Sequence, residues 1–208
     1  MTPKKQAEQV ANVEFRPESV ELTLRGRPGS PLVIHNFGEK AKEEIRGKQQ
    51  KKPKAAKGAR NPQEEYLAAR YVDGQGRECA PVTAIKKALI TAATAFSDLT
   101  KVALRQSLFV DPVTCPGGMF IPIETSKGDP AQSVMREDAV TIGMNTRDLR
   151  YRPEYADWQL RVRIEFNPRL VSREQLLALV DQAGWGVGIC EGRPERSSAL
   201  GWGRFQRA

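Results

Sequence analysis

The sequence has few of the features that mark membrane, secreted or disulfide-rich proteins. Its longest apolar runs, such as Ala88–Ile90, are far shorter than the roughly 20 residues that a membrane-spanning helix needs. No apolar segment follows the polar start Met1–Lys5, so we expect no secretion signal. Three cysteines, Cys79, Cys115 and Cys190, form no Cys-x-x-Cys pair and cannot all be bridged, which favours a reducing compartment. These absences predict a cytoplasmic protein with no membrane partner.

The common catalytic and metal-binding motifs are also missing. His35 is the only histidine, which excludes a histidine pair or a histidine-rich metal site. Patterns for a nucleophile elbow, a zinc protease, a phosphate-binding loop or a pair of catalytic carboxylates do not occur. We therefore predict a protein that is not an enzyme and that uses no cofactor and no metal. The alternative is a metal-independent ribonuclease with His35 as its general base. His35 could instead lie at a strand end and form a hydrogen bond that is purely structural.

What the sequence does have is an uneven distribution of positive charge. The 208 residues carry a formal net charge of +8. Residues 40–60, called the basic arm below, hold nine basic residues against two acidic ones, a net charge of +7. A charge run is commonly just a solvated surface. A +7 segment on an almost neutral body, however, is the pattern expected for a polyanion partner, because each phosphate contact releases counterions.

The C-terminal third has a second distinctive composition. Residues 136–208 contain twelve arginines and no lysine, and the segment Gly184–Phe205 contains six glycines. Glycines let a backbone approach a phosphate closely, and arginines bind phosphate through two parallel hydrogen bonds. The alternatives are a structural loop that closes the last strand and a codon bias toward arginine. A dinucleotide-binding loop is rejected, because the glycines of Gly184–Gly188 follow an expected helix instead of preceding one.

Hydrophobic periodicity predicts a single α+β domain over residues 1–208. Alternating apolar residues predict strands, and apolar stripes at helical spacing predict helices. The expected elements are a strand at 19–25 with a returning strand at Leu32–Ile34, a helix at 81–96, strands at 106–110 and 158–166, a helix at 172–184 that begins with a Ser172–Gln175 capping box, and a strand at 202–206. This order fits a ferredoxin-like βαββαβ core.

Two insertions are expected to interrupt this core. The first, residues 39–78, contains the basic arm, followed by a short helix that begins at Asn61–Pro62 and runs through Tyr71. The second, residues 125–150, is expected to be a hairpin with Val134–Met135 and Val140–Ile142 as its two arms.

Six segments together resemble a family of small proteins encoded by tailed bacteriophages. They span about residues 31–206 and are Ile34–Lys42, Asn61–Tyr66, Pro81–Ile90, Asp148–Tyr155, Gly188–Glu195 and Gly203–Phe205. The family has little assigned function. The resemblance implies a bacteriophage protein that works in the cytoplasm of the host cell.

The Gly-rich C-terminal segment on a ferredoxin-like core is similar to the CRISPR-associated RAMP superfamily, whose backbone subunits bind guide RNA along a filament. This resemblance implies that RNA or single-stranded DNA binds to the arm, the Gly-rich loop and nearby arginines. It also implies that copies lie side by side, as a homo-oligomer or filament. The sequence lacks a second ferredoxin-like unit and so departs from the two-lobed processing endonucleases of that superfamily.

The leading hypothesis is a non-enzymatic RNA- or single-stranded-DNA-binding protein that oligomerises along the strand. Its expected phosphate contacts are Lys48, Lys51, Lys52, Lys54, Lys57 and Arg60 in the arm, and Arg150, Arg152, Arg193, Arg196 and Arg204 in the C-terminal third. The alternative is a protein-interaction role. The protein would then be a phage assembly factor, or a CRISPR-inhibiting mimic of a backbone subunit, with host CRISPR or phage proteins as partners.

Overall fold

The computed structural model describes residues 16–36, 46–47, 49–50, 60–115, 117–142, 146–197 and 199–208. Within these residues the chain forms two antiparallel sheets and four α-helices, which confirms the predicted α+β class. No helix in this part of the chain has both the length and the apolar character that crossing a lipid bilayer requires.

The main sheet is built around two strands whose apolar residues alternate with polar ones, as the sequence predicts. They are β1 (Glu18–Gly26) and β9 (Gln159–Phe166), which pair antiparallel with Leu22 opposite Val162. The other strands are β5 (Leu108–Pro112), β10 (Phe205–Arg207), β6 (Phe120–Glu124), β4 (Glu78–Pro81) and β3 (Tyr71–Val72). The order is β10-β1-β9-β6-β4-β3, and β5 also pairs with β9.

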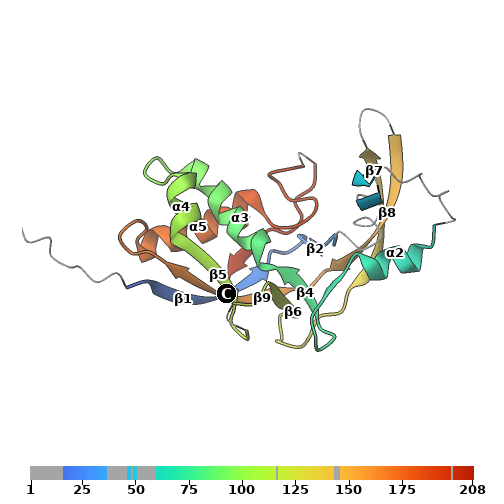
Figure 1. Ribbon diagram of the computed structural model, residues 1–208, viewed down its shortest axis with the longest axis horizontal. Coiled ribbons are helices and arrows are strands. Elements are labelled where there is room, and N and C mark those ends of the chain that lie inside the picture. Colours follow the sequence, from blue (N-terminus) through green and yellow to red (C-terminus); the bar gives the residue numbers. More distant parts are fainter. Residues whose placement is uncertain are drawn as a thin grey trace, which may run out of the picture.

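Helices cover one face of the main sheet, and the core lies between the two layers (Figure 1). The three helices there are α3 (Val82–Ala92), which a 3-10 turn extends to Ala95, α4 (Lys101–Ser107) and α5 (Arg173–Gln182). The predicted capping box of α5 is confirmed, because the Gln175 amide donates to Ser172 Oγ (3.2 Å) and the Ser172 amide donates to Gln175 Oε1 (2.9 Å). Residues 101–107 are helical, so the strand expected at 106–110 begins only at Leu108.

The second sheet corrects the expectation for Leu32–Ile34. Its strands are β2 (Leu32–Val33), β8 (Thr146–Tyr155) and β7 (Val134–Ile142). The expected return of Leu32–Ile34 along β1 is wrong, because β2 pairs with the end of β8 instead, Leu32 opposite Tyr155. Hydrogen bonds at the preceding turn hold the chain away from β1: Ser30 Oγ donates to the Gly201 carbonyl (2.6 Å) and Trp158 Nε1 donates to the Ser30 carbonyl (3.0 Å).

The β7–β8 hairpin rises at the far end of the main sheet (Figure 1). The two arms expected within 125–150 lie in the same strand, β7, and the partner strand extends to Tyr155. Beside β8 lies α2 (Pro62–Ala68), which begins after Asn61 as predicted, since the Asn61 side chain accepts hydrogen bonds from two amides of the first turn. Tyr71 belongs to β3 and not to this helix.

Candidate nucleic-acid interface

The predicted phosphate contacts of the basic arm fall mostly outside the described residues. Lys48, Lys51, Lys52, Lys54 and Lys57 lie there, so their role stays a prediction. The two points from which the arm leaves and returns are described. Asn36 donates its amide to the Ala69 carbonyl (2.8 Å) and its side chain to the Arg70 carbonyl (3.0 Å), just after α2. Arg60 contacts β8. The arm is therefore attached next to α2 and the β7–β8 hairpin.

Arg60 and Arg150 share an acidic partner at the surface. The Arg60 guanidinium donates to both carboxylate oxygens of Glu65 (2.6 and 2.5 Å), to Asp148 and to the Leu149 carbonyl (2.7 Å). Arg150 Nε lies 3.3 Å from the same Asp148 carboxylate. Burial would raise the pKa of Asp148, but its bonds to the two arginines outweigh this and hold that pKa below its usual value. Both guanidinium groups are thus already partly neutralised.

Arg152 is placed differently from what the sequence suggests. Its side chain is 8% exposed and forms ion pairs with Asp138 (2.7 Å) and Glu191 (3.1 Å). Arg136 joins the same network through Asp138 (2.8 Å) and Glu154 (2.8 Å). A phosphate would reach the Arg152 guanidinium only after its ion pairs were broken, and breaking the buried pair with Asp138 is costly. Arg152 therefore connects the hairpin to the Gly-rich segment and is not open to a polyanion.

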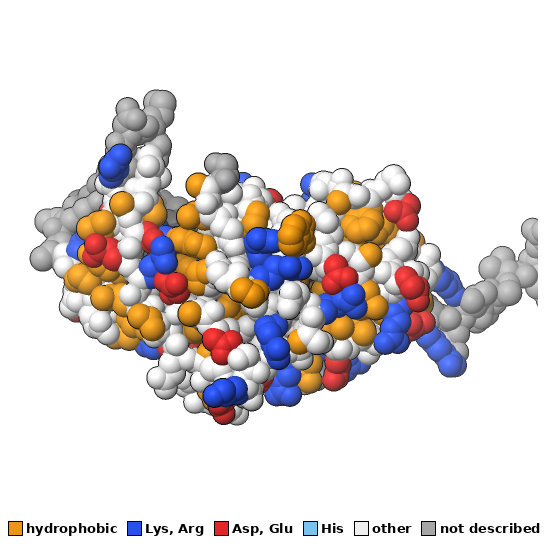
Figure 2. Space-filling model, turned by 180° about the vertical axis from the view of Figure 1, so that it is seen from behind, with side chains coloured by type: hydrophobic (Ala, Val, Ile, Leu, Met, Phe, Trp, Pro, Cys, Tyr) orange, Lys and Arg blue, Asp and Glu red, His pale blue; other side chains and the backbone are white. Residues whose placement is uncertain are grey.

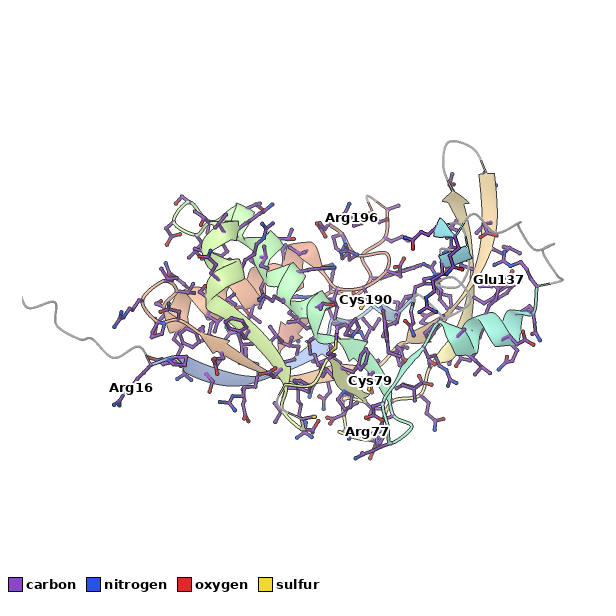
Figure 3. The ribbon with its side chains drawn as sticks, in the orientation of Figure 1. Arg16, Arg77, Cys79, Glu137, Cys190 and Arg196 are labelled. Carbon is purple, nitrogen blue, oxygen red and sulfur yellow. The ribbon has the colours of Figure 1, made fainter. Side chains whose placement is uncertain are left out.

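The three arginines of the C-terminal segment differ in how much of their charge is available. Arg193 donates to the Cys190 carbonyl (2.7 Å) and pairs with Glu195 at 2.9 Å. The Arg196 side chain is 72% exposed and comes no closer than 4.0 Å to Glu195; Figure 3 shows it at the outer edge of the loop. Arg204 forms no ion pair with any described residue. Its Nε donates to the Trp185 carbonyl (3.0 Å) and its Cζ lies 4.5 Å from the centre of the Trp185 ring.

The Gly-rich segment has a structural role at Gly203. This residue has φ +64°, and an added Cβ would overlap the carbonyl of Ile189. The Ile189 amide donates to the Gly203 carbonyl (3.0 Å), and the Gly203 amide donates to the Pro31 carbonyl (2.8 Å). Only glycine combines this conformation with so close an approach. At this position the glycine is therefore needed for the packing of the segment that leads into β10.

A pocket of about 210 Å³ separates the start of α3 from the Gly-rich segment. Its charged lining includes Lys87 and Arg193 but also Glu191 and Glu195, so it is not a strongly positive site. His35 lines it too, with Nε2 3.4 Å from the Arg150 guanidinium and Nδ1 buried without a partner. Burial, and then the charge of Arg150, lower the pKa of His35, which keeps the imidazole neutral at pH 7.

The pocket that His35 lines also contains a thiol. Cys190 also lines it, in a left-handed conformation with φ 60°. Burial raises the pKa of the Cys190 thiol to about 12, so the reactive thiolate is scarce at neutral pH. Among the described residues no group of three His, Cys, Asp or Glu side chains is arranged to hold a metal ion.

On the face of the body shown in Figure 2, basic, acidic and hydrophobic side chains are interspersed. This surface is consistent with the ion pairs described above, in which the arginines of the body meet carboxylates of the same body. It does not form one continuous basic field. The strongest unbalanced charge in the chain is that of the basic arm.

Two residues near Arg204 belong to the candidate site, although no motif in the sequence indicates them. Trp185 lies in a π-turn at Ala183–Val187, directly after α5, and is 58% exposed. Arg27, in the turn after β1, has its Cζ 4.8 Å from the Trp185 ring centre. Only the pairing of β1 with β10 brings Arg27 next to Arg204, so a reading of the sequence alone misses the cluster.

Comparison with known proteins gives little support for a family assignment. No protein-family model matches the chain, and no curated protein matches its sequence. Among solved structures, the chain is similar to Cmr6 from Pyrococcus furiosus, with a TM-score of 0.39 and 10% sequence identity over 94% of this chain and 100% of that chain. A similarity at this level defines neither a shared fold nor a shared function. The resemblance to a tailed-bacteriophage family stays a prediction.

Proposed function

We propose that the protein binds single-stranded nucleic acid, RNA or DNA, without catalysing a reaction on it. The observation that carries the proposal is the concentration of charge, because the basic arm holds +7 of the net +8. Many arginines of the body, in contrast, are paired with its own carboxylates, as Arg70, Arg136 and Arg152 illustrate. The arm is thus the main charge left to attract a polyanion.

Within the proposal, Arg196 and Arg204 form the second contact group, because their guanidinium groups are the least engaged of those predicted. We also infer that β1, α3, β5, β9, α5 and β10 form a ferredoxin-like βαββαβ unit. This is supported by the antiparallel order β10-β1-β9-β5 and by the helices that follow β1 and β9. Such a unit would present the arm and Arg204 from one scaffold. A bacteriophage origin, assembly along the strand and a location in the host cytoplasm belong to the same proposal.

The proposal is tested by measuring binding of fluorescein-labelled oligouridylate and oligothymidylate across a range of salt concentrations. We expect log K to fall linearly with log salt. Replacing Lys48, Lys51, Lys52, Lys54 and Lys57 with Gln should flatten that slope by up to about 3.5, at roughly 0.7 per phosphate contact on a single strand. The matched control replaces Lys101 and Lys127, two exposed lysines outside the arm, and should leave the slope nearly unchanged. Absent or salt-insensitive binding by the wild type contradicts the proposal.

Two further measurements separate the proposal from its alternatives. The wild type should leave labelled RNA intact on a denaturing gel; cleavage that His35→Ala abolishes would instead establish a ribonuclease. Protein purified from cells should carry nucleic acid, seen as a raised ratio of absorbance at 260 to 280 nm that falls after nuclease treatment. Nucleic-acid-free protein that retains a bound host or phage protein would support the protein-interaction role.

A further inference from the structure

Among the described residues, an exposed tryptophan lies next to two arginines that form no ion pair. These residues, Arg27, Trp185 and Arg204, are called the Arg–Trp cluster below. Of the three tryptophans, Trp158 is 1% exposed and Trp202 lies against Gly192, whereas Trp185 is 58% exposed. The Cζ atoms of Arg27 and Arg204 lie 4.8 and 4.5 Å from the Trp185 ring centre. Two guanidinium groups thus lie over the indole, and the rest of its surface is open to solvent.

The cluster is fixed in place by hydrogen bonds to backbone carbonyls. Arg27 Nε donates to the Phe205 carbonyl (3.1 Å), and Arg204 Nε donates to the Trp185 carbonyl (3.0 Å). The Arg27 amide donates to the Arg204 carbonyl (3.0 Å), which joins the end of β1 to the start of β10. Gly184 packs so tightly on Phe205 that an added Cβ would overlap the Phe205 carbonyl. The three side chains are therefore positioned before any ligand binds, which lowers the entropic cost of binding.

The two arginines differ from most others of the body in lacking an acidic partner. Neither Arg27 nor Arg204 forms an ion pair with a residue that the structure describes, whereas Arg70, Arg152 and Arg193 each do. The side-chain hydrogen bonds of Arg27 and Arg204 to described residues use only Nε. The terminal N–H groups of both guanidiniums are thus available, and these form the fork that binds a phosphate through two parallel hydrogen bonds.

We infer that the Arg–Trp cluster is a nucleotide contact of the single-stranded ligand. In this arrangement one base packs on the exposed part of the Trp185 indole and the guanidiniums over it, and the terminal N–H groups of Arg27 and Arg204 bind the phosphates on either side of that base. The inference rests on the proposed function and adds to it a base contact outside the basic arm. Two phosphate-binding forks beside an exposed indole match a ligand that alternates anionic groups with flat aromatic rings. An acidic protein segment would use the forks but would leave the ring without a stacking partner.

The test compares Trp185→Ala with a matched variant, Phe109→Ala. Phe109 is also an exposed aromatic residue (52%) with a cation nearby, since Lys86 Nζ lies 4.6 Å from its ring centre. Binding of labelled oligothymidylate should weaken about 5- to 150-fold in Trp185→Ala, the range measured for loss of one stacked base, and should barely change in Phe109→Ala. The salt slope should stay the same in both, because no charge is removed.

One additional ligand and two additional variants separate the contribution of the ring from that of the charges. An oligomer of the same length made of abasic units should bind the wild type and Trp185→Ala equally, because it offers phosphates without bases. Arg27→Gln combined with Arg204→Gln should flatten the salt slope by about 1.4, from two phosphate contacts. The double lysine variant should restore the slope but not the full affinity, because lysine lacks the planar fork. Thermal unfolding should confirm that each variant is folded.

The outcomes distinguish this inference from the proposed function. If the wild type binds no oligonucleotide, the proposed function fails and the inference with it. If the wild type binds and Trp185→Ala binds equally well, the inference is wrong and the proposed function stands. Equal losses for the abasic and the base-containing oligomer would also overturn base stacking. A co-purifying protein that Trp185→Ala releases, without any change in oligonucleotide binding, would show that the cluster binds protein instead.

Discussion

At the scale of single residues, Glu78 is the carboxylate that the fold surrounds most completely. It is 9% exposed and accepts hydrogen bonds from Tyr155 Oη (2.6 Å), Arg70 Nη1 (2.8 Å) and the Ser133 amide (3.0 Å). Burial would raise the pKa of Glu78, but these bonds outweigh it and hold that pKa below its ordinary value of 4.5. The charged carboxylate therefore ties β4 and β8 together, with β7 reached through Ser133.

Replacement of Tyr155 with Phe should lower the free energy of unfolding by about 1.5–3 kcal/mol at neutral pH, because it removes a hydrogen bond to a charged group. Since the folded state lowers the pKa of Glu78, the stabilisation is present above pH 4.5 and is lost as the pH falls below it. The difference between wild type and Tyr155→Phe should therefore shrink in acid. Urea denaturation at several pH values measures this, and a difference that is constant with pH would contradict the role given to the Glu78 charge.

At the scale of elements, the closure of the last strand depends on a glycine that no other residue replaces. Gly203→Ala should reduce the free energy of unfolding by at least about 2 kcal/mol, from a strained left-handed backbone and the overlap with Ile189. Gly74→Ala is the matched control, because nothing lies within 4 Å of its added Cβ. Chemical denaturation should separate the two variants clearly. Equal stability of both would show that the β10 region adapts more easily than its packing indicates.

The elements that the sequence predicts well are those whose burial follows a local period. β9 alternates apolar and charged residues along its full length, and α5 combines an apolar stripe with its capping box, so neighbouring residues suffice to define them. β7 and β8 have no such pattern. They pair as a hairpin, from Ile142 opposite Thr146 to Val134 opposite Glu154, but no local period marks where either strand begins or ends. The partner of β2 could not be predicted either, because a strand of two residues carries no information about its neighbour.

For the candidate site, the sequence locates charge but not its partners. The +7 of the arm follows from counting residues, whereas the neutralisation of Arg152 by Asp138 and Glu191 needs three elements to come together. The Arg–Trp cluster likewise draws on residues from both ends of the chain. The sequence therefore shows where the basic residues are, and only the fold shows which of them remain available to a ligand.

At the scale of the whole molecule, salt should affect binding far more than folding. Most ion pairs of the body are at least partly exposed, and such pairs contribute about 0–1 kcal/mol each. Raising the salt concentration should therefore change the thermal midpoint by only a few degrees, while nucleic-acid affinity falls by orders of magnitude. Thermal unfolding and anisotropy titrations in the same buffers check this. A midpoint that falls in parallel with affinity would mean that weaker binding reports unfolding and not lost phosphate contacts.

The pairing of β1 with β9 sets a time order for folding on the ribosome. Leu22 meets Val162, so β1 leaves the ribosome long before its central partner is made. At 5–20 residues per second, about 7–28 seconds of translation separate the two strands. During that interval the apolar side of β1 lacks the sheet that buries it, and chaperone binding would protect it from aggregation. The completed body, in contrast, encloses that side between β9, β10 and the helices.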